Sequence, residues 1–307
     1  MSPPPLADAL RDRFVVVNLG AGGDAELALP DHVRRSVTLV QIDAANAPVD
    51  ESSVHRRVPL RRVVADAHGT RTFHEAAYPW CSSLVPPRPG LVRRYGLEDY
   101  FETVASTEVE CFTLPEALAE AGVAEIDFLG TDVEGLDAPI LRTSSELLAR
   151  ALVVRSELRF EPMYEGEPPF HEAVALMEER GFELVGVDPE AWKPATPRQR
   201  RHRDGRTVWA DCVFVRRSDA LPDAPADLSG LVEAKQVLLT AMTGLRAWAE
   251  HLLERNSGAI PADWHADLWR ATAPVPGGRV RERAADLAVR LRRRVPPRPR
   301  FDLRHVV

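Results

Sequence analysis

The sequence has few cysteines, no long apolar run and no excess of positive charge. Its 307 residues include three cysteines, without C-x-x-C spacing or a nearby pair of histidines, so neither a disulfide framework nor a zinc site is expected. No window approaches the roughly 18 apolar residues of a membrane span, and the first residues lack the basic and apolar regions of a signal peptide. These absences predict a soluble protein without a transmembrane segment, located in a reducing cytoplasm.

The net charge of -7 is unevenly distributed along the chain. Ten arginines lie between Gly278 and Arg304, so the remainder of the chain is clearly acidic. An acidic surface repels phosphate backbones, which argues against a general nucleic-acid partner. The apolar content of 45% is ordinary for a globular protein and sufficient for one large α/β domain with an additional segment.

An apolar run that ends in two carboxylates organises the rest of the chain. Within 125–136, Ile126, Phe128 and Leu129 are typical of a strand buried in a parallel sheet, and Asp132 and Glu134 follow at its carboxyl end. Ligands of open α/β sheets bind at that edge. The alternative is that Asp132 only caps the following helix.

A second feature lies near the start of the chain, where an apolar run at 14–20 ends in a glycine-rich turn. Gly20, Ala21 and Gly22 would allow close approach of a ligand to the backbone. The next strand, at 37–43, ends in Asp43, 23 positions after Gly20. Nucleotide-binding units place a ribose-binding carboxylate about 20 residues after the glycines, so we expect an adenosine-containing cofactor. A plain glycine turn with a surface aspartate is the alternative.

The spacing of apolar and turn residues predicts the other elements. We expect strands at 61–66, 70–75, 107–112, 151–160, 182–187 and 207–216, and helices at 114–121, 138–150 and 171–180. The last two strands have no helix between them, which predicts an antiparallel pair at the sheet edge. Glu157 would stand beside Asp132 if their strands are neighbours.

The C-terminal part follows a linker-like stretch at 218–229. Apolar residues then recur at helical spacing from Leu231 to Arg255, which indicates either core packing or a seam between two copies of the chain. The arginine-rich stretch from Arg279 to Arg294 is either a solvated tail or a contact for an anionic partner.

With these residues in view, the chain resembles the FkbM family of S-adenosylmethionine-dependent methyltransferases over Val15 to Val187. The segment from Ile126 to Gly135 is similar to the family signature I-D-x-L-K-x-D-V-E-G, and 82–84 matches its S-S-L loop. The chain departs from the pattern at several positions. Gly130 stands where the family usually has lysine, Asn18 where its first strand often carries an acid, and Asp24 where another glycine is common. Gln41-Ile42-Asp43 replaces the usual sequence of phenylalanine or valine, glutamate and proline, and Asp43 keeps the acid.

The resemblance implies a Rossmann-like class I methyltransferase fold, an α/β structure whose mostly parallel seven-stranded sheet has one antiparallel edge strand. The expected parts are an N-terminal tail (1–12), the methyltransferase domain (13–218) and a helical C-terminal extension (219–307). S-adenosyl-L-methionine would be the cofactor and a sugar or secondary-metabolite hydroxyl the acceptor, with a homodimer formed through the C-terminal helices.

The resemblance and the residue patterns together assign the candidate site. The expected catalytic residues are Asp132, Glu134 and Glu157, and no metal is expected. The expected cofactor-binding residues are Asn18, Gly20, Ala21, Gly22, Asp43, Asp66 and Ser83.

Two other functions stay open at this point. Gly20, Gly22 and Ala25 also fit the dinucleotide fingerprint of a nicotinamide dehydrogenase, although Pro30 would interrupt the long helix that such a fingerprint opens. The second alternative is a scaffold that binds the cofactor without catalysis, because Gly130 and Asn18 depart from the family pattern.

Overall fold

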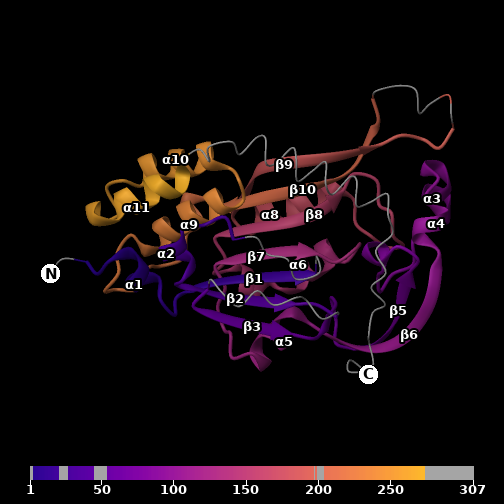
Figure 1. The fold of residues 1–307 in the computed structure, drawn as a ribbon, viewed down its shortest axis with the longest axis horizontal. Helices are drawn as coiled ribbons and strands as arrows, with labels where there is room; N and C mark the ends of the chain where they lie inside the picture. Colours follow the sequence, from indigo (N-terminus) through magenta and orange to yellow (C-terminus); the bar gives the residue numbers. More distant parts are fainter. Residues whose placement is uncertain (1–2, 21–26, 45–53, 197, 199–203, 274–307) are drawn as a thin grey trace.

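A seven-stranded sheet forms the centre of the computed structural model, which describes residues 3–20, 27–44, 54–196, 198 and 204–273 (Figure 1). The strand order is β3-β2-β1-β7-β8-β10-β9. The strands are β1 (Phe14–Gly20), β2 (Val37–Ile42), β3 (Arg56–Leu60), β7 (Phe128–Asp132), β8 (Val153–Arg159), β9 (Phe182–Trp192) and β10 (Arg206–Arg216). The first five strands in this order, β3, β2, β1, β7 and β8, pair in parallel with their neighbours. Strand β10 is antiparallel to both of its neighbours, β8 and β9. The predicted mostly parallel α/β sheet is confirmed.

Two details of the predicted sheet are wrong. The antiparallel strand is β10, which lies second from the edge, because β9 pairs on its outer side. The third parallel strand is β3 at 56–60 rather than 61–66. Its two adjacent arginines and Pro59 conceal it in the sequence, but a proline is tolerated at a sheet edge, where β3 lies.

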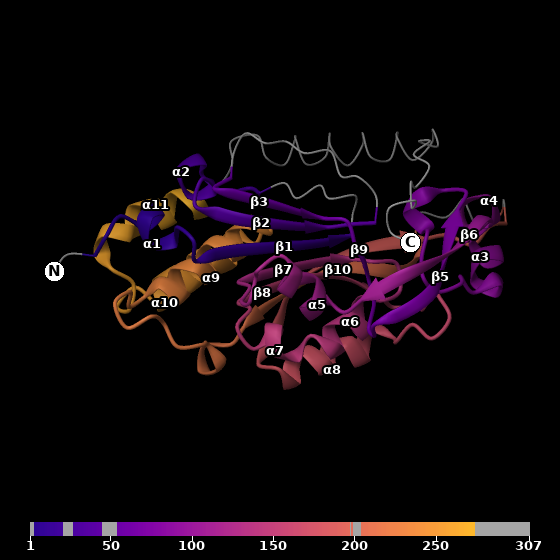
Figure 2. The same ribbon diagram turned by 90° about the horizontal axis from the view of Figure 1, so that it is seen from below.

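Four helices cover one face of this sheet (Figure 2). They are α5 (Leu114–Glu120), α6 (Asp137–Thr143), α7 (Ser145–Leu148) and α8 (Phe170–Glu179). Val17 and Leu19 of β1 pack on this side, in one hydrophobic cluster with residues of α5, α6 and α8. Side chains alternate between the faces of a strand, so Phe14 and Val16 point to the other face.

The C-terminal helices pack on that second face, at the end of the molecule where the parallel strands begin (Figure 1). These helices are α9 (Leu231–Met242), α10 (Arg246–Arg255) and α11 (Ala262–Thr272), and α1 (Leu6–Leu10) and α2 (Asp31–Arg34) lie beside them. The expected single helix at 231–255 is interrupted by Gly244, which has a φ of 89°. The apolar stripe of α9 is buried in the core of the chain itself.

Two polar contacts tie these helices to distant parts of the chain. The Lys235 ammonium on α9 lies 2.8 Å from the Asp127 carboxylate, whose other oxygen accepts a hydrogen bond from the Val15 backbone. The Trp264 indole on α11 donates a 2.8 Å hydrogen bond to the Pro4 carbonyl. The last described helices are thus built into the same fold as the first strand.

A second sheet, of three strands, lies at the end of the molecule toward which the parallel strands run (Figures 1 and 2). Its order is β4 (Val63–Val64), β6 (Thr103–Phe112) and β5 (Gly69–Ala76). The short helices α3 (Pro89–Tyr95) and α4 (Glu98–Phe101) connect β5 to β6. The expected strands at 70–75 and 107–112 are confirmed as β5 and β6, and β6 is the central strand of this sheet.

Among the described residues, none of the helices has the length and apolar character needed to cross a membrane. The arginine-rich stretch from Arg279 to Arg294 lies outside the described residues.

Candidate functional site

The candidate site lies at the topological switch point of the main sheet, between β1 and β7. Strand β1 has β2 on one side and β7 on the other. The chain after β1 therefore continues toward one edge of the sheet, and the chain after β7 continues toward the opposite edge. Ligands of open α/β sheets bind at such a switch point, beyond the carboxyl ends of the strands. Gly20 and Asp132 are paired there in register. A Cβ on Gly20 would lie 2.0 Å from the Asp132 carbonyl oxygen, so only glycine fits this close contact.

The alternation along β7 and β8 places the predicted acidic residues on one face. Phe128 packs with the C-terminal helices, so Gly130 and Asp132 share its face of the sheet. On β8, Val153 packs in the same cluster, and Glu157 and Arg159 therefore share that face too. Polar side chains thus replace apolar ones on this face toward the carboxyl ends of both strands.

Three predicted catalytic residues come together at this edge. Carboxylate oxygens of Asp132, Glu134 and Glu157 all lie within 4.8 Å of one another. The expectation that Glu157 stands beside Asp132 is confirmed. Helix α6 begins at Asp137, after Leu136, and no side chain caps it. The alternative role of Asp132 as a helix cap is therefore wrong.

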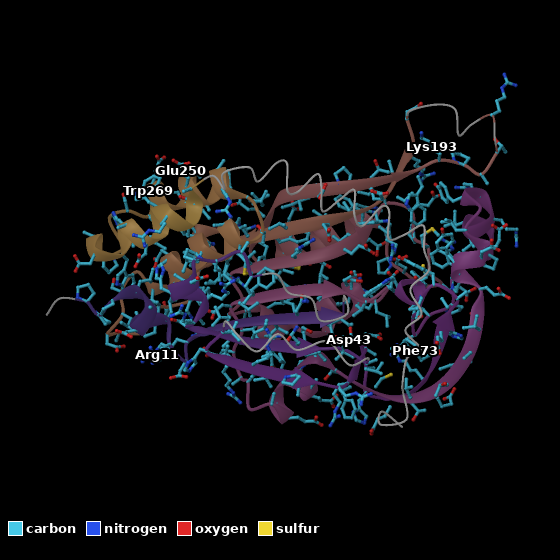
Figure 3. The ribbon with its side chains drawn as sticks, in the orientation of Figure 1. Arg11, Asp43, Phe73, Lys193, Glu250 and Trp269 are labelled. Atoms are coloured by element: carbon cyan, nitrogen blue, oxygen red, sulfur yellow. The ribbon has the colours of Figure 1, made fainter. Side chains whose placement is uncertain are left out.

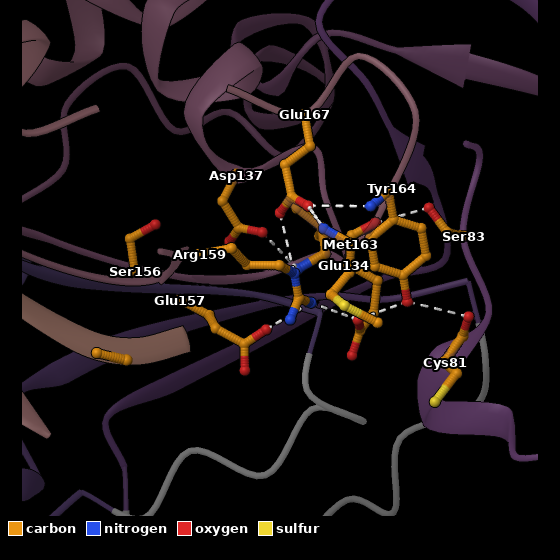
Figure 4. A network of polar contacts seen from close by, with 12 residues as sticks. Cys81, Ser83, Glu134, Asp137, Ser156, Glu157, Arg159, Met163, Tyr164 and Glu167 are labelled. Atoms are coloured by element: carbon orange, nitrogen blue, oxygen red, sulfur yellow. Dashed lines mark hydrogen bonds and ion pairs between the residues drawn. The ribbon is translucent and has the colours of Figure 1, made fainter. Parts of the chain in front are cut away.

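Arg159 lies at the centre of the cluster and is only 5% exposed (Figure 4). Its Nη2 is 2.6 Å from Glu134 Oε2 and 2.7 Å from Glu157 Oε1, and its Nε is 2.9 Å from Glu167 Oε1. Glu167 also accepts hydrogen bonds from the backbone amides of Met163 and Tyr164, which closes the loop that follows β8. One guanidinium therefore holds three glutamates in place.

The backbone at Glu134 adopts a left-handed conformation, with a φ of 49°. The Ser83 hydroxyl donates a 2.7 Å hydrogen bond to the Glu134 carbonyl, and the Tyr164 hydroxyl lies 2.8 Å from Glu134 Oε2 (Figure 4). The same hydroxyl is 3.2 Å from the carbonyl of Cys81, in the turn η2 (Pro79–Cys81). A Cβ on Gly135 would lie 2.8 Å from the Tyr164 ring. The connection that follows β5 and the loop that follows β8 thus meet at the turn that carries Glu134.

Burial raises the pKa of the acidic groups in the cluster. It is the largest cause of the rise at Asp132, and it raises the pKa of Glu134 to about 7. The pKa of Glu157 is also raised by burial, against the lowering effect of Arg159. Neighbouring carboxylates add a smaller rise, as expected for like charges. The pKa of Asp137 is raised to about 8, by burial first and by Asp132 second.

The three carboxylates are also close enough to share a divalent cation, since Mg²⁺ and Ca²⁺ prefer oxygen ligands. Glu134 and Glu157 are already paired with Arg159. The Asp132 carboxylate has no hydrogen bond or ion pair within the described part of the chain, so its oxygens are free to bind a cation. The expectation of no metal is untested.

The other predicted cofactor residues are distributed around the switch point. Asp43 directly follows β2, and the negative charge of Asp43 reaches Asp132 and raises its pKa. Figure 3 places Asp43 toward Phe73 of the second sheet, far from the C-terminal helices. Asp66 follows β4 in the second sheet and forms an ion pair with Arg71, at 2.7 Å. Ala21 and Gly22 lie outside the described residues.

Arg159, Tyr164 and Glu167 were not predicted as site residues. The Glu-x-Arg spacing of Glu157 and Arg159 was a usable signal, because residues two apart on a strand share a face. For Tyr164 and Glu167 the sequence gives no comparable signal, since they belong to an irregular loop.

Residues 56–184 match the family model of the methyltransferase FkbM domain. The resemblance to this family is confirmed over that segment, although the match starts at 56 rather than Val15 and does not include the glycine turn. The search of curated proteins found no match.

Two solved structures are similar at low levels. One is a protein from Streptococcus thermophilus named "Putative hemolysin", with 11% identity over 81% of this chain and 70% of the other, and a TM-score of 0.28. The other, from Pyrococcus horikoshii, is named a "putative RNA methyltransferase", with 13% identity over 66% and 74% of the two chains and a TM-score of 0.22. At these TM-scores neither structure bears on the function.

Proposed function

We propose that this chain, whose residues 56–184 match the FkbM methyltransferase domain, transfers a methyl group from S-adenosyl-L-methionine to a hydroxyl of a sugar or secondary metabolite. The observation that carries the proposal is the register pair of Gly20 and Asp132 at the switch point between β1 and β7. Gly20, the first residue of the glycine-rich segment, thereby lies beside Asp132, whose carboxylate suits proton abstraction. A cytoplasmic location and a homodimer belong to the same proposal.

The residues at the switch point fit such a cofactor. Gly20 permits the close contact between the ends of β1 and β7, and the Asn18 amide has no hydrogen-bond partner among the described residues. Asp43 follows β2, where a carboxylate accepts hydrogen bonds from ribose hydroxyls in nucleotide-binding units. When bound, the cofactor supplies an electrophilic methyl group on a sulfonium. Ser83 and Asp66 are proposed to contact it from the second sheet.

The chain's own residues then have two tasks: to align the acceptor oxygen with the methyl group and to remove the acceptor's proton. Asp132 and Glu157 are the proposed bases, because they meet at the carboxyl ends of β7 and β8 and burial raises the pKa of each, which strengthens a carboxylate as a base. Glu134 is proposed to orient the acceptor.

The dehydrogenase alternative is disfavoured by the helix after the glycine turn. Helix α2 begins after Pro30 and has four residues, so within the described part of the chain no long helix follows this turn. The FkbM match likewise supports methyl transfer.

Calorimetry tests the cofactor assignment. We expect S-adenosylhomocysteine to bind and NAD not to bind. Asp43→Ala should weaken S-adenosylhomocysteine binding by about 1.5–3 kcal/mol, the range for hydrogen bonds to a charged group. An unchanged dissociation constant in a folded Asp43→Ala protein would remove Asp43 from the site.

Turnover tests the reaction. Methyl-labelled cofactor is incubated with a panel of sugars and hydroxylated secondary metabolites, with Mg²⁺ and with EDTA. Labelled product in both conditions supports a base that acts without metal, and loss of label only with EDTA assigns an ion to the carboxylate cluster. Cofactor binding without transfer to any panel member would favour the inactive scaffold.

A further inference from the structure

Asn18 and Gly130 are neighbours across the switch point. They are paired in register on β1 and β7, two residues before Gly20 and Asp132. Both lie on the face that carries Val16 and Phe128. A Cβ built on Gly130 would lie 2.7 Å from Asn18 Oδ1, closer than real Cβ contacts, and 3.2 Å from Phe128 Cε1. The amide of Asn18 therefore occupies the space that a side chain at 130 would fill.

The Asn18 amide also has hydrogen-bonding capacity that the described part of the chain leaves unused. Its side chain is partly exposed, and no described residue forms a hydrogen bond with it. An amide both donates and accepts, so it can bind a hydroxyl, an amine or a carboxylate without adding charge. It points away from the helices α5 to α8 and lies next to the close contact between Gly20 and Asp132.

We propose that Asn18 and Gly130 form one cofactor-binding unit, in which the missing side chain at 130 allows the Asn18 amide to take the rotamer that contacts the cofactor. Gly130 is the positioning residue and Asn18 the contacting residue. The inference rests on the proposed cofactor and adds Gly130 to its site.

The unit explains the departures from the FkbM pattern at 18 and 130 as one change. Lysine at 130 and an acid at 18 would place opposite charges side by side on adjacent strands, where such pairs attract. Glycine and asparagine at these positions are both neutral and fit each other sterically. The two departures therefore give no reason to regard the site as inactive.

A double-mutant cycle measured by calorimetry with S-adenosylhomocysteine tests the unit. Asn18→Ala should raise the dissociation constant about 3- to 10-fold, as for one neutral hydrogen bond. Gly130→Ala should raise it by a similar factor, because the methyl group displaces the amide. The double variant should be no weaker than Asn18→Ala alone, because the displaced group is already absent.

Thermal unfolding separates this effect from a structural one. The amide is the mobile end of a side chain, so Gly130→Ala should leave the melting temperature close to that of the unchanged protein. Gly90→Ala is the matched control, because a Cβ on Gly90 meets no atom within 4 Å, and it should change neither binding nor melting.

Additive losses in the double variant would overturn the coupling and assign the effect of Gly130→Ala to Phe128. An unchanged dissociation constant for Asn18→Ala would also overturn the proposal, while the proposed function would stand. Failure of the unchanged protein to bind S-adenosylhomocysteine would overturn both.

Discussion

Asp132 differs from Glu134 and Glu157 in its ion-pair partners. Arg159 contacts Glu134 and Glu157, whereas the Asp132 carboxylate has no such partner among the described residues. Asp132→Asn should lower turnover by roughly 10² to 10⁴, the usual effect of losing a general base. Affinity for S-adenosylhomocysteine should change little, because the amide preserves shape. Rates from the label-transfer assay and calorimetry provide the two measurements.

Glu157→Gln is the comparison for that experiment. If Glu157 is the base, its variant shows the larger loss of turnover and Asp132→Asn retains activity. A loss of thermal stability alone in Asp132→Asn would assign this residue a structural role.

Asp137 should make the stability of the protein depend on pH. It is 4% exposed, and burial raises its pKa from 3.8 to about 8. The folded protein therefore holds this proton more tightly than the unfolded chain, so stability falls as pH rises from about 4 to about 8. The slope is at most about 1.4 kcal/mol per pH unit for one proton.

Asp137→Asn should remove this contribution while its amide oxygen still accepts the hydrogen bond from the Val133 backbone. Urea unfolding at pH 5 and pH 8 provides the measurement, and the unchanged protein should lose more stability between them than the variant. Asp219→Asn, at an exposed position, should behave like the unchanged protein. Equal losses in all three proteins would contradict the raised pKa.

The residues of the site could be predicted where a regular strand positions them. Asp132 and Glu157 follow from the buried apolar runs that precede them, and their meeting follows from strand adjacency. The left-handed backbone of Glu134 could not be predicted, because contacts with Ser83 and Tyr164, 51 and 30 residues away, accompany it.

At the scale of elements, one ion pair joins α9 to the beginnings of β1 and β7. The side chains of Lys235 and Asp127 are 11% and 13% exposed. Lys235→Met should destabilise the fold by about 3–5 kcal/mol, because it leaves the buried carboxylate of Asp127 without a partner charge. Urea unfolding provides the measurement.

The pair of Arg150 and Glu125 is the matched control, because both side chains are about half exposed or more. Glu125→Gln should cost at most about 1 kcal/mol. The double variant Lys235→Met, Asp127→Asn should recover part of the loss, and no recovery would mean that Lys235 acts through packing alone.

Elements were predicted correctly where their sequence was locally consistent. Helix α5 begins with Thr113 and Glu116, which form a reciprocal capping box, and the antiparallel pair of β9 and β10 follows from two apolar runs without an intervening helix. Strand β3 was missed because its charges suit an exposed edge rather than a buried strand.

For the whole molecule, two truncations test which parts are needed to fold. Deletion of 219–307 removes α9, α10 and α11 and exposes one apolar face of the sheet, so the shortened protein should fail to fold. Deletion of 278–307 leaves all described elements intact and should preserve S-adenosylhomocysteine binding. Circular dichroism and calorimetry provide the measurements.

The second truncation also tests the arginine-rich stretch. If it contacts an acidic surface, sedimentation of the full chain should depend on salt, because exposed charges are screened over about 8 Å at physiological ionic strength. Identical sedimentation of the full and shortened proteins at low and high salt would mean that the arginine-rich stretch does not contact an acidic surface. The division at 218 remains a prediction, and a folded 1–218 fragment would support it.

The packing of α9 against β1 also constrains the order of events during synthesis. The apolar face of β1 leaves the ribosome early, but the helix that covers it is made more than 200 residues later. At about 5–20 residues per second, that strand waits about 10 to 40 seconds for its covering layer. From the synthesis of β8 until that of α9, the nascent chain therefore carries one apolar face of these strands without its covering helices, a state that holdase chaperones bind. Faster synthesis of the last 80 residues should therefore raise the yield of native protein. Substitutions near the carboxylates should change this yield less.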